Sequence, residues 1–158
     1  GAGALDPLAP AGDGTMAARL PAMARVREVL YVEDNRVNAI LMASVFEDRP
    51  DFHLTVAETG ADALEAARTL RPDVLLLDMH LPDTDGLALL AALRRLPHLA
   101  QVPAAVVSAD AMPADIERAL AAGFAAYWTK PLDIGRLMAE LSELVAGAPE
   151  QGDTPPAA

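Results

Sequence analysis

Two kinds of hydrophobic pattern alternate along the chain. Short apolar runs, rich in leucine, β-branched or aromatic residues, have the length of buried strands. They lie at 28–32, 52–57, 73–77, 104–108 and 125–129. Each is followed by a longer segment in which apolar residues recur every three or four positions, as on one face of a helix. Five such strand–helix units predict a parallel sheet covered by helices on both faces.

The helical segments carry signals of their own. The first, 35–48, is expected to be amphipathic, with one apolar stripe made of Val37, Ile40, Leu41 and Val45. Pro113 near the first turn and Gly123 after the last turn bound the fourth helix. In the last helix Asp133 is placed as the N-cap. One face of that helix is expected to contain Ile134, Leu137, Met138, Leu141, Leu144 and Val145.

Composition narrows the class of protein. The 158 residues are 53% apolar and contain no cysteine, which suits one compact domain and excludes a disulfide framework or a thiolate metal site. The apolar runs are too short to cross a membrane, so we expect a cytoplasmic domain that makes no membrane contact. The formal net charge of −11 argues against direct nucleic-acid binding, which requires a basic surface.

The patterned sequence occupies only part of the chain. Residues 1–26 and 148–158 are rich in Gly, Pro and Ala and show no sustained apolar period. We therefore expect a linker or disordered arm before the domain and a disordered tail after it. The domain itself is expected over 27–147, the length of one compact unit.

Polar residues gather at the predicted ends of the strands. The first strand stops at Glu33 and Asp34, the third at Asp78, the fourth at Ser108 and the fifth at Lys130, the only lysine of the chain. In doubly wound folds, ligands bind beyond the carboxyl ends of the strands, which meet at one edge of the sheet. Three crowded carboxylates repel one another unless a cation lies among them, and Mg²⁺ prefers hard oxygen ligands of this kind.

Four motifs at these strand ends resemble the receiver domain of two-component response regulators, the CheY-like family. The motifs are YVEDN (31–35), LLLDMHLPDTDG (75–86), VVSAD (106–110) and YWTKP (127–131). Three segments are most similar to receivers attached to hybrid sensor histidine kinases: VEDNRVN, SADAMPADIERALAAGF and TKPLD. The resemblance implies a doubly wound, flavodoxin-like (βα)₅ fold with strand order 2-1-3-4-5.

The resemblance implies a Mg²⁺ site. Asp34 and Asp78 would bind the metal directly, and Glu33 would bind it largely through water. The backbone carbonyl of His80 would complete the protein ligands. The imidazole of His80 is expected to be loop surface that modulates dephosphorylation, because an imidazole metal site has no partners in this sequence.

The resemblance also implies how the phosphoryl group is held and sensed. Asp78 would be the nucleophile that carries it, with Lys130 as the facing cation and Ser108 as the hydroxyl donor. The bond between Lys130 and Pro131 would be cis. Ser108 and Tyr127 would form the switch: Ser108 turns toward the phosphoryl group, and Tyr127 rotates from an outward position.

The implied function is a phosphoacceptor that is phosphorylated by the phosphohistidine of a histidine kinase or a histidine phosphotransfer domain. Catalysis by this chain would be limited to its own phosphorylation and slow dephosphorylation at Asp78. A histidine kinase activity would reside in a parent chain outside this sequence. A homodimer through the fourth helix, fifth strand and fifth helix is also expected.

Two other interpretations compete with this one. A receiver-like module that binds partners without phosphorylation would be favoured by a missing acid or lysine, and none is missing. The segment DTDG (83–86) resembles the nucleophile loop of haloacid-dehalogenase-type phosphatases. That loop directly follows a strand, however, whereas Leu81 and Pro82 intervene here. Asp83 and Asp85 are instead expected to provide loop polarity and a cap for the third helix.

Overall fold

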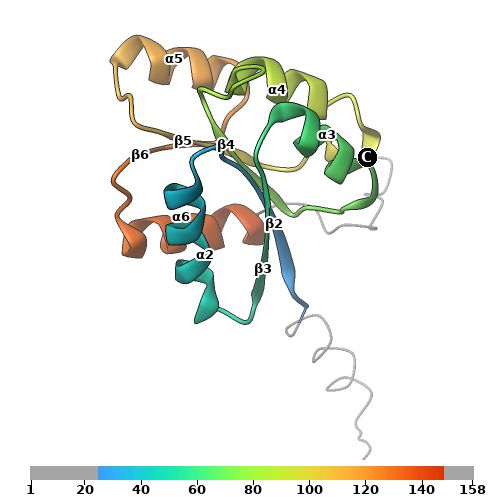
Figure 1. Ribbon diagram of the computed structural model, residues 1–158, viewed down its shortest axis with the longest axis vertical. Coiled ribbons are helices and arrows are strands. Elements are labelled where there is room, and N and C mark those ends of the chain that lie inside the picture. Colours follow the sequence, from blue (N-terminus) through green and yellow to red (C-terminus); the bar gives the residue numbers. More distant parts are fainter. Residues whose placement is uncertain (1–24, 148–158) are drawn as a thin grey trace, which may run out of the picture.

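The computed structural model describes residues 25–147. At its centre is one parallel sheet (Figure 1) made of β2 (Arg27–Val32), β3 (Phe52–Ala57), β4 (Val74–Asp78), β5 (Ala104–Ser108) and β6 (Ala126–Thr129). The strands lie in the order β3-β2-β4-β5-β6, which confirms the expected 2-1-3-4-5 order. The order of strands reverses between β2 and β4, so the crevice for a ligand opens at the carboxyl ends of these two strands.

Helices cover both faces of the sheet. Within residues 25–147 they are α2 (Arg36–Glu47), α3 (Gly60–Thr69), α4 (Gly86–Leu93), α5 (Pro113–Ala121) and α6 (Ile134–Ala146), with a short 3₁₀ turn at Pro97–Leu99. Figure 1 shows α3, α4 and α5 on one side of the sheet and α2 and α6 on the other. The chain therefore has the doubly wound architecture that the alternating pattern predicts.

Each face of the sheet has its own hydrophobic core, because successive side chains of a strand point to opposite faces. Leu30, Leu75 and Leu77 belong to the core that also contains the buried leucines of α4. Val29 and Leu76 belong to the core under α2 and α6, together with Trp128. All five residues of β4 are buried, as expected for a central parallel strand. The last of them is Asp78, so the strand carries a carboxylate to the edge of the core.

The loop after β4 is fastened to two helices. Asp85 caps α4, since its side chain accepts a hydrogen bond from the Ala88 N–H, as predicted. Asp83 caps a different helix, α3: its carboxylate accepts from the N–H groups of Gly60 (2.9 Å) and Ala61 (3.0 Å). A β-carbon at Gly86 would lie 2.8 Å from Met79 Sδ and 3.0 Å from the Asp78 carbonyl oxygen. Glycine therefore allows α4 to begin this close to the end of β4.

The apolar stripe predicted for the first helix is wrong for three of its four residues; only Val45 packs against the core. α2 packs against the sheet through Met42 and Phe46. Three apolar residues of α2 are exposed instead: Val37 (65%), Ile40 (61%) and Leu41 (59%). We call these three residues the α2 apolar face. Apolar residues occur at nearly every position between 39 and 46, so periodicity alone does not distinguish two overlapping stripes. Ile134, in the first turn of α6, is likewise 44% exposed.

The predicted linker and tail lie outside the described residues, apart from Arg25 and Val26. Arg25 Nη2 lies 2.7 Å from Oδ1 of the buried Asp73. Within residues 25–147 no helix is both long enough and apolar enough to span a lipid bilayer.

Candidate functional site

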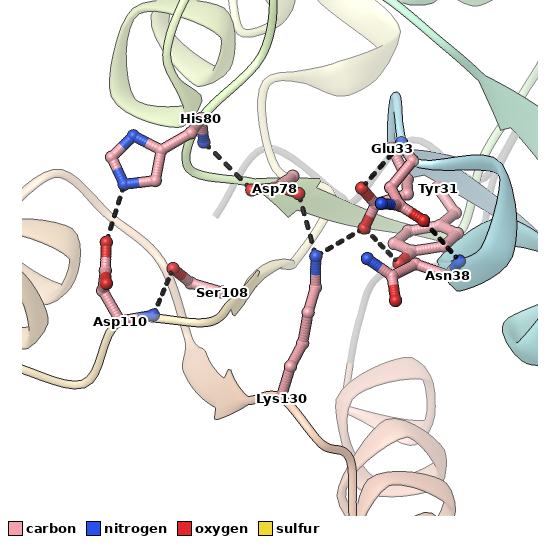
Figure 2. A network of polar contacts seen from close by, with 9 residues as sticks. Tyr31, Glu33, Asn38, Asp78, His80, Ser108, Asp110 and Lys130 are labelled. Atoms are coloured by element: carbon pink, nitrogen blue, oxygen red, sulfur yellow. Dashed lines mark hydrogen bonds and ion pairs between the residues drawn. The ribbon is translucent and has the colours of Figure 1, made fainter.

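Four strands bring their polar ends together at one edge of the sheet. β4 ends on Asp78 and β5 on Ser108, while Glu33 directly follows β2 and Lys130 directly follows β6. Because β4 lies between β2 and β5 in the sheet, Asp78 is at the centre of this edge. Figure 2 shows the Lys130 side chain extending between Asp78 and Glu33.

Both oxygens of Asp78 accept hydrogen bonds. Oδ1 accepts from the His80 N–H at 3.0 Å, and Oδ2 accepts from Lys130 Nζ at 3.0 Å. The residue is only 6% exposed. Burial raises the pKa of the Asp78 carboxyl; the bonds from His80 and Lys130 oppose this effect, and the nearby Glu33 carboxylate adds to it. The anion at Asp78 thus depends on positive charge nearby.

Glu33 is a buried carboxylate held by three donors. Its Oε1 accepts from Lys130 Nζ at 2.6 Å and from Tyr31 Oη at 2.8 Å, and its Oε2 accepts from the Asn35 N–H at 3.1 Å. Burial on its own raises the pKa of Glu33, but its hydrogen bonds, led by those from Lys130 and Tyr31, together hold the pKa below its ordinary value. Glu33 is therefore a carboxylate at neutral pH.

Lys130 and Tyr31 are both protonated beside these acids. Burial alone lowers the pKa of Lys130, but its bonds to Glu33 and Asp78 raise it above the ordinary value. Burial, and then the bond to Glu33, raise the pKa of the Tyr31 phenol far above the normal range. The ammonium and the hydroxyl are thus both donors at neutral pH. The peptide bond between Lys130 and Pro131 is cis, as the resemblance implied.

Three carboxylates form a cluster suited to a divalent cation. One oxygen each of Glu33, Asp34 and Asp78 lie within 4.8 Å of one another. Asp34 is exposed to solvent, whereas Glu33 and Asp78 are buried. The donors are hard oxygens and one acid is open to water, which fits Mg²⁺, a cation that keeps several waters and takes one or two carboxylates. The ligand role of the His80 carbonyl stays a prediction.

A second network lies on the other side of Asp78 and centres on Asp110. Ser108 Oγ accepts from the Asp110 N–H at 3.1 Å, and His80 Nε2 lies 2.9 Å from Asp110 Oδ2. Tyr127 Oη donates to the Asp110 carbonyl at 2.6 Å. Ser108 is fully buried. The loop after β5 is therefore tied both to the loop that follows Asp78 and to the aromatic residue of β6.

The structure brings together Glu33, Asp34, Asp78 and Lys130 as the sequence predicted. One expectation needs correction: Tyr127 is half-buried and its hydroxyl is bonded to the loop after β5 rather than directed outward. The His80 side chain is loop surface, as expected, since it is 73% exposed, and its imidazole pairs there with Asp110.

Two further residues of the site, Tyr31 and Asp110, were not predicted from the sequence. Tyr31 stands two positions before Glu33, so strand periodicity places both side chains on one face. That spacing is a signal that could have found it.

A central parallel sheet that ends in an acid cluster, a facing lysine and a serine defines a class of protein: the receiver domains of two-component systems. The family model for the response regulator receiver domain matches residues 29–142. The chain belongs to this family. Receiver domains bind Mg²⁺ at an acidic pocket, accept a phosphoryl group and interact with histidine kinases or phosphotransfer proteins.

Two relatives show how the family uses this domain. The chain is 35% identical over 109 residues to the signal transduction histidine-protein kinase BarA of Escherichia coli K12; the match covers 69% of this chain but 12% of BarA. It is 32% identical over 122 residues to the polar-differentiation response regulator DivK of Brucella anthropi, covering 77% of this chain and 98% of DivK. The matching region thus occurs both within a long kinase and as nearly the whole of a regulator.

Solved structures share the fold. The receiver domain of the sensor histidine kinase PA1611 from Pseudomonas aeruginosa, which has a magnesium ion coordinated in its active-site cleft, is 29% identical. The match covers 77% of this chain and 99% of that one, with a TM-score of 0.70. The chemotaxis response regulator CheY4 of Vibrio cholerae is 22% identical over 75% of this chain and 98% of its own, with a TM-score of 0.69. The second likeness shows the fold alone.

Proposed function

We propose that Asp78 of this receiver accepts a phosphoryl group from the phosphohistidine of a partner protein, with Mg²⁺ held by the acid cluster. The observation that carries the proposal is the position of Lys130, whose Nζ lies 3.0 Å from Asp78 Oδ2 at the end of the central strand. Phosphoryl transfer spreads negative charge over the oxygens of the transferred group, so fixed positive charge beside the acceptor favours it.

The reaction is a displacement at phosphorus. A carboxylate oxygen of Asp78 forms the new O–P bond while the N–P bond of phosphohistidine breaks, and the electron pair of the broken bond stays on the imidazole. Lys130 neutralises charge on the transferred oxygens. Ser108 supplies a hydroxyl donor from the neighbouring strand β5, whose other residues are alanine and valine. When bound, Mg²⁺ supplies further positive charge to the same oxygens. Glu33, Asp34 and Asp78 are the residues that would hold it.

The experiment is phosphorylation of the isolated chain by acetyl phosphate, followed by intact mass spectrometry. We expect one phosphoryl group in the presence of Mg²⁺ and none with a chelator. Asp78→Asn should abolish labelling. Asp83→Asn is the matched control, because it removes a carboxylate of the same loop that caps α3 and faces no lysine. Undiminished labelling of Asp78→Asn would overturn the assignment.

The phosphohistidine partner binds over the α2 apolar face. An exposed apolar patch of this kind marks an interaction surface. A cavity of about 360 Å³ lies beside the patch and is lined by Leu41 of α2, Ile134 of α6 and Lys130. Leu41 of the patch and Lys130 of the site thus line the same cavity, so a partner that covers α2 also lies next to the lysine that is bonded to Asp78.

Leu41→Glu separates binding of the partner from chemistry. The variant should lose most phosphotransfer from a phosphorylated histidine phosphotransfer domain while it keeps wild-type labelling by acetyl phosphate. Leu120→Glu is the matched control, since Leu120 is 52% exposed on α5, away from that cavity. Equal phosphotransfer to Leu41→Glu and to wild type would place the partner elsewhere.

The other interpretations receive less support. Asp83 and Asp85 are both engaged in capping helices, so neither is placed as the nucleophile of a phosphatase. A phosphorylation-independent module has no use for a lysine directed at Asp78. A hybrid histidine kinase as the parent protein is supported by the match to BarA. The homodimer through α5, β6 and α6 stays a prediction, to be tested by light scattering with and without phosphorylation.

A further inference from the structure

Tyr31 is a buried polar residue for which the fold alone gives no reason. It lies on β2, is 1% exposed, and its ring packs in the core under α2 and α6. Its neighbours in register on the adjacent strands are Val56 and Leu76, both aliphatic. An aliphatic side chain would meet the packing requirement at this position without burying a hydroxyl, which costs free energy unless it is hydrogen-bonded.

Within residues 25–147 the acceptor of the Tyr31 hydroxyl is Glu33, a member of the acid cluster. Tyr31 Oη donates to Glu33 Oε1 at 2.8 Å, and Figure 2 shows the phenol lying against that carboxylate. The same oxygen accepts from Lys130 Nζ at 2.6 Å. Two donors therefore converge on one oxygen, while the Asn35 N–H at 3.1 Å holds the other. The orientation of the Glu33 carboxylate is fixed at both oxygens.

The Tyr31 hydroxyl also affects Lys130. The ammonium of Lys130 donates to Glu33 Oε1 at 2.6 Å and to Asp78 Oδ2 at 3.0 Å. A buried carboxylate that loses a donor draws more strongly on those that remain. Without the Tyr31 hydroxyl, Lys130 is the side-chain donor that stays bonded to Glu33 within residues 25–147. The ammonium would then be held closer to Glu33 and would be less available to Asp78.

We propose that Tyr31 is a positioning residue: its hydroxyl fixes Glu33 so that Lys130 remains shared with the phosphoacceptor Asp78. The effect of this contact on phosphorylation rests on the function proposed above, but its effect on the resting geometry does not. Loss of the hydroxyl should weaken Mg²⁺ binding, because a cation must then compete with a tighter contact between Lys130 and Glu33. It should also slow phosphorylation at saturating Mg²⁺.

The test is Tyr31→Phe, which removes the hydroxyl and keeps the ring. In metal-free protein, the NMR signals of the Asn35 amide and of Lys130 Nζ should move, because both groups are bonded to Glu33. Mg²⁺ titration should give a dissociation constant about fivefold higher, the size expected for one net hydrogen bond. The rate of labelling by acetyl phosphate at saturating Mg²⁺ should fall by a similar factor.

Two controls separate positioning from packing. In a double-mutant cycle, Tyr31→Phe should have little further effect on Mg²⁺ affinity once Glu33→Gln is present, since its effect acts through that carboxylate. Leu76→Val removes a methylene next to Tyr31 and should lower the melting temperature without changing the Mg²⁺ dissociation constant.

The experiments distinguish a failure of the proposed function from a failure of the role proposed for Tyr31. If the wild-type chain takes no phosphoryl group, the proposed function fails, while the metal-free NMR comparison still decides the role of Tyr31. Unmoved Asn35 and Lys130 signals in Tyr31→Phe would overturn that role. Effects of Tyr31→Phe and Glu33→Gln on Mg²⁺ affinity that simply add would overturn it too.

Discussion

Replacing Lys130 by glutamine should separate metal binding from phosphoryl transfer. Lys130 is 17% exposed and contacts Asp78 Oδ2 at 3.0 Å and Glu33 Oε1 at 2.6 Å. Glutamine retains an N–H donor but removes the charge. Three carboxylates whose oxygens lie within 4.8 Å of one another would then have no cation among them. Breaking a buried pair costs about 3–5 kcal/mol, and because this site opens to solvent we expect about 2–3 kcal/mol in metal-free protein.

Mg²⁺ affinity should change in the opposite direction. The ammonium and the cation compete for the same carboxylates. At a separation like the 4.8 Å of the acid cluster, a single and a double positive charge repel by about 1.7 kcal/mol in a water-like dielectric. That energy corresponds to roughly 20-fold in a dissociation constant. Lys130→Gln should therefore bind Mg²⁺ more tightly than wild type and still be phosphorylated far more slowly, because the charge that faces the phosphoryl group is gone.

The assays are thermal melting with a chelator, Mg²⁺ titration by calorimetry, and the rate of labelling by acetyl phosphate at saturating Mg²⁺. Arg136→Gln is the matched control: it changes the net charge equally, and Arg136 is an exposed residue paired with Glu140. Unchanged or weaker Mg²⁺ binding in Lys130→Gln, with Arg136→Gln like wild type, would show that Lys130 does not compete with the metal. Undiminished labelling would refute its role in transfer.

Three further predictions follow from the same site. Asp34→Ala should bind Mg²⁺ at least tenfold more weakly in calorimetry with an unchanged melting temperature in chelator, because Asp34 is an exposed acid of the cluster; equal affinity would place the metal elsewhere. Burial raises the pKa of Asp78 in the folded state, so above the ordinary carboxyl pKa the folded chain still holds a proton that the unfolded chain has released. The contribution of Asp78 to the free energy of unfolding of the metal-free protein therefore falls as the pH rises through that range. Asp78→Asn should melt about 2–5 °C higher than wild type in chelator at neutral pH, and this difference should shrink on acidification; a constant difference would contradict the assignment. Ser108→Ala and Tyr127→Ala should still take a phosphoryl group but show weak phosphorylation-linked amide NMR shifts over α5, β6 and α6; full shifts in either variant would exclude that residue from the switch.

Local patterns in the sequence determined the order of the elements and the chemistry at their ends. Apolar runs followed by helical segments place Asp78, Ser108 and Lys130 at strand ends, since parallel strands end at one edge. The caps Asp85 and Asp133 were also predictable, because capping depends on a few residues in succession.

Only the tertiary structure decided which helix face is buried and which polar groups pair. α2 has apolar residues on overlapping stripes, and packing against the sheet selects Met42 and Phe46 while leaving Leu41 exposed. Asp83 caps α3, a helix 22–23 positions earlier in the chain, which no local pattern indicates. The bonds from Lys130 to Glu33 and Asp78 span 97 and 52 positions. Periodicity assigns a residue to a face of its own element, whereas its partners depend on how elements distant in sequence pack together.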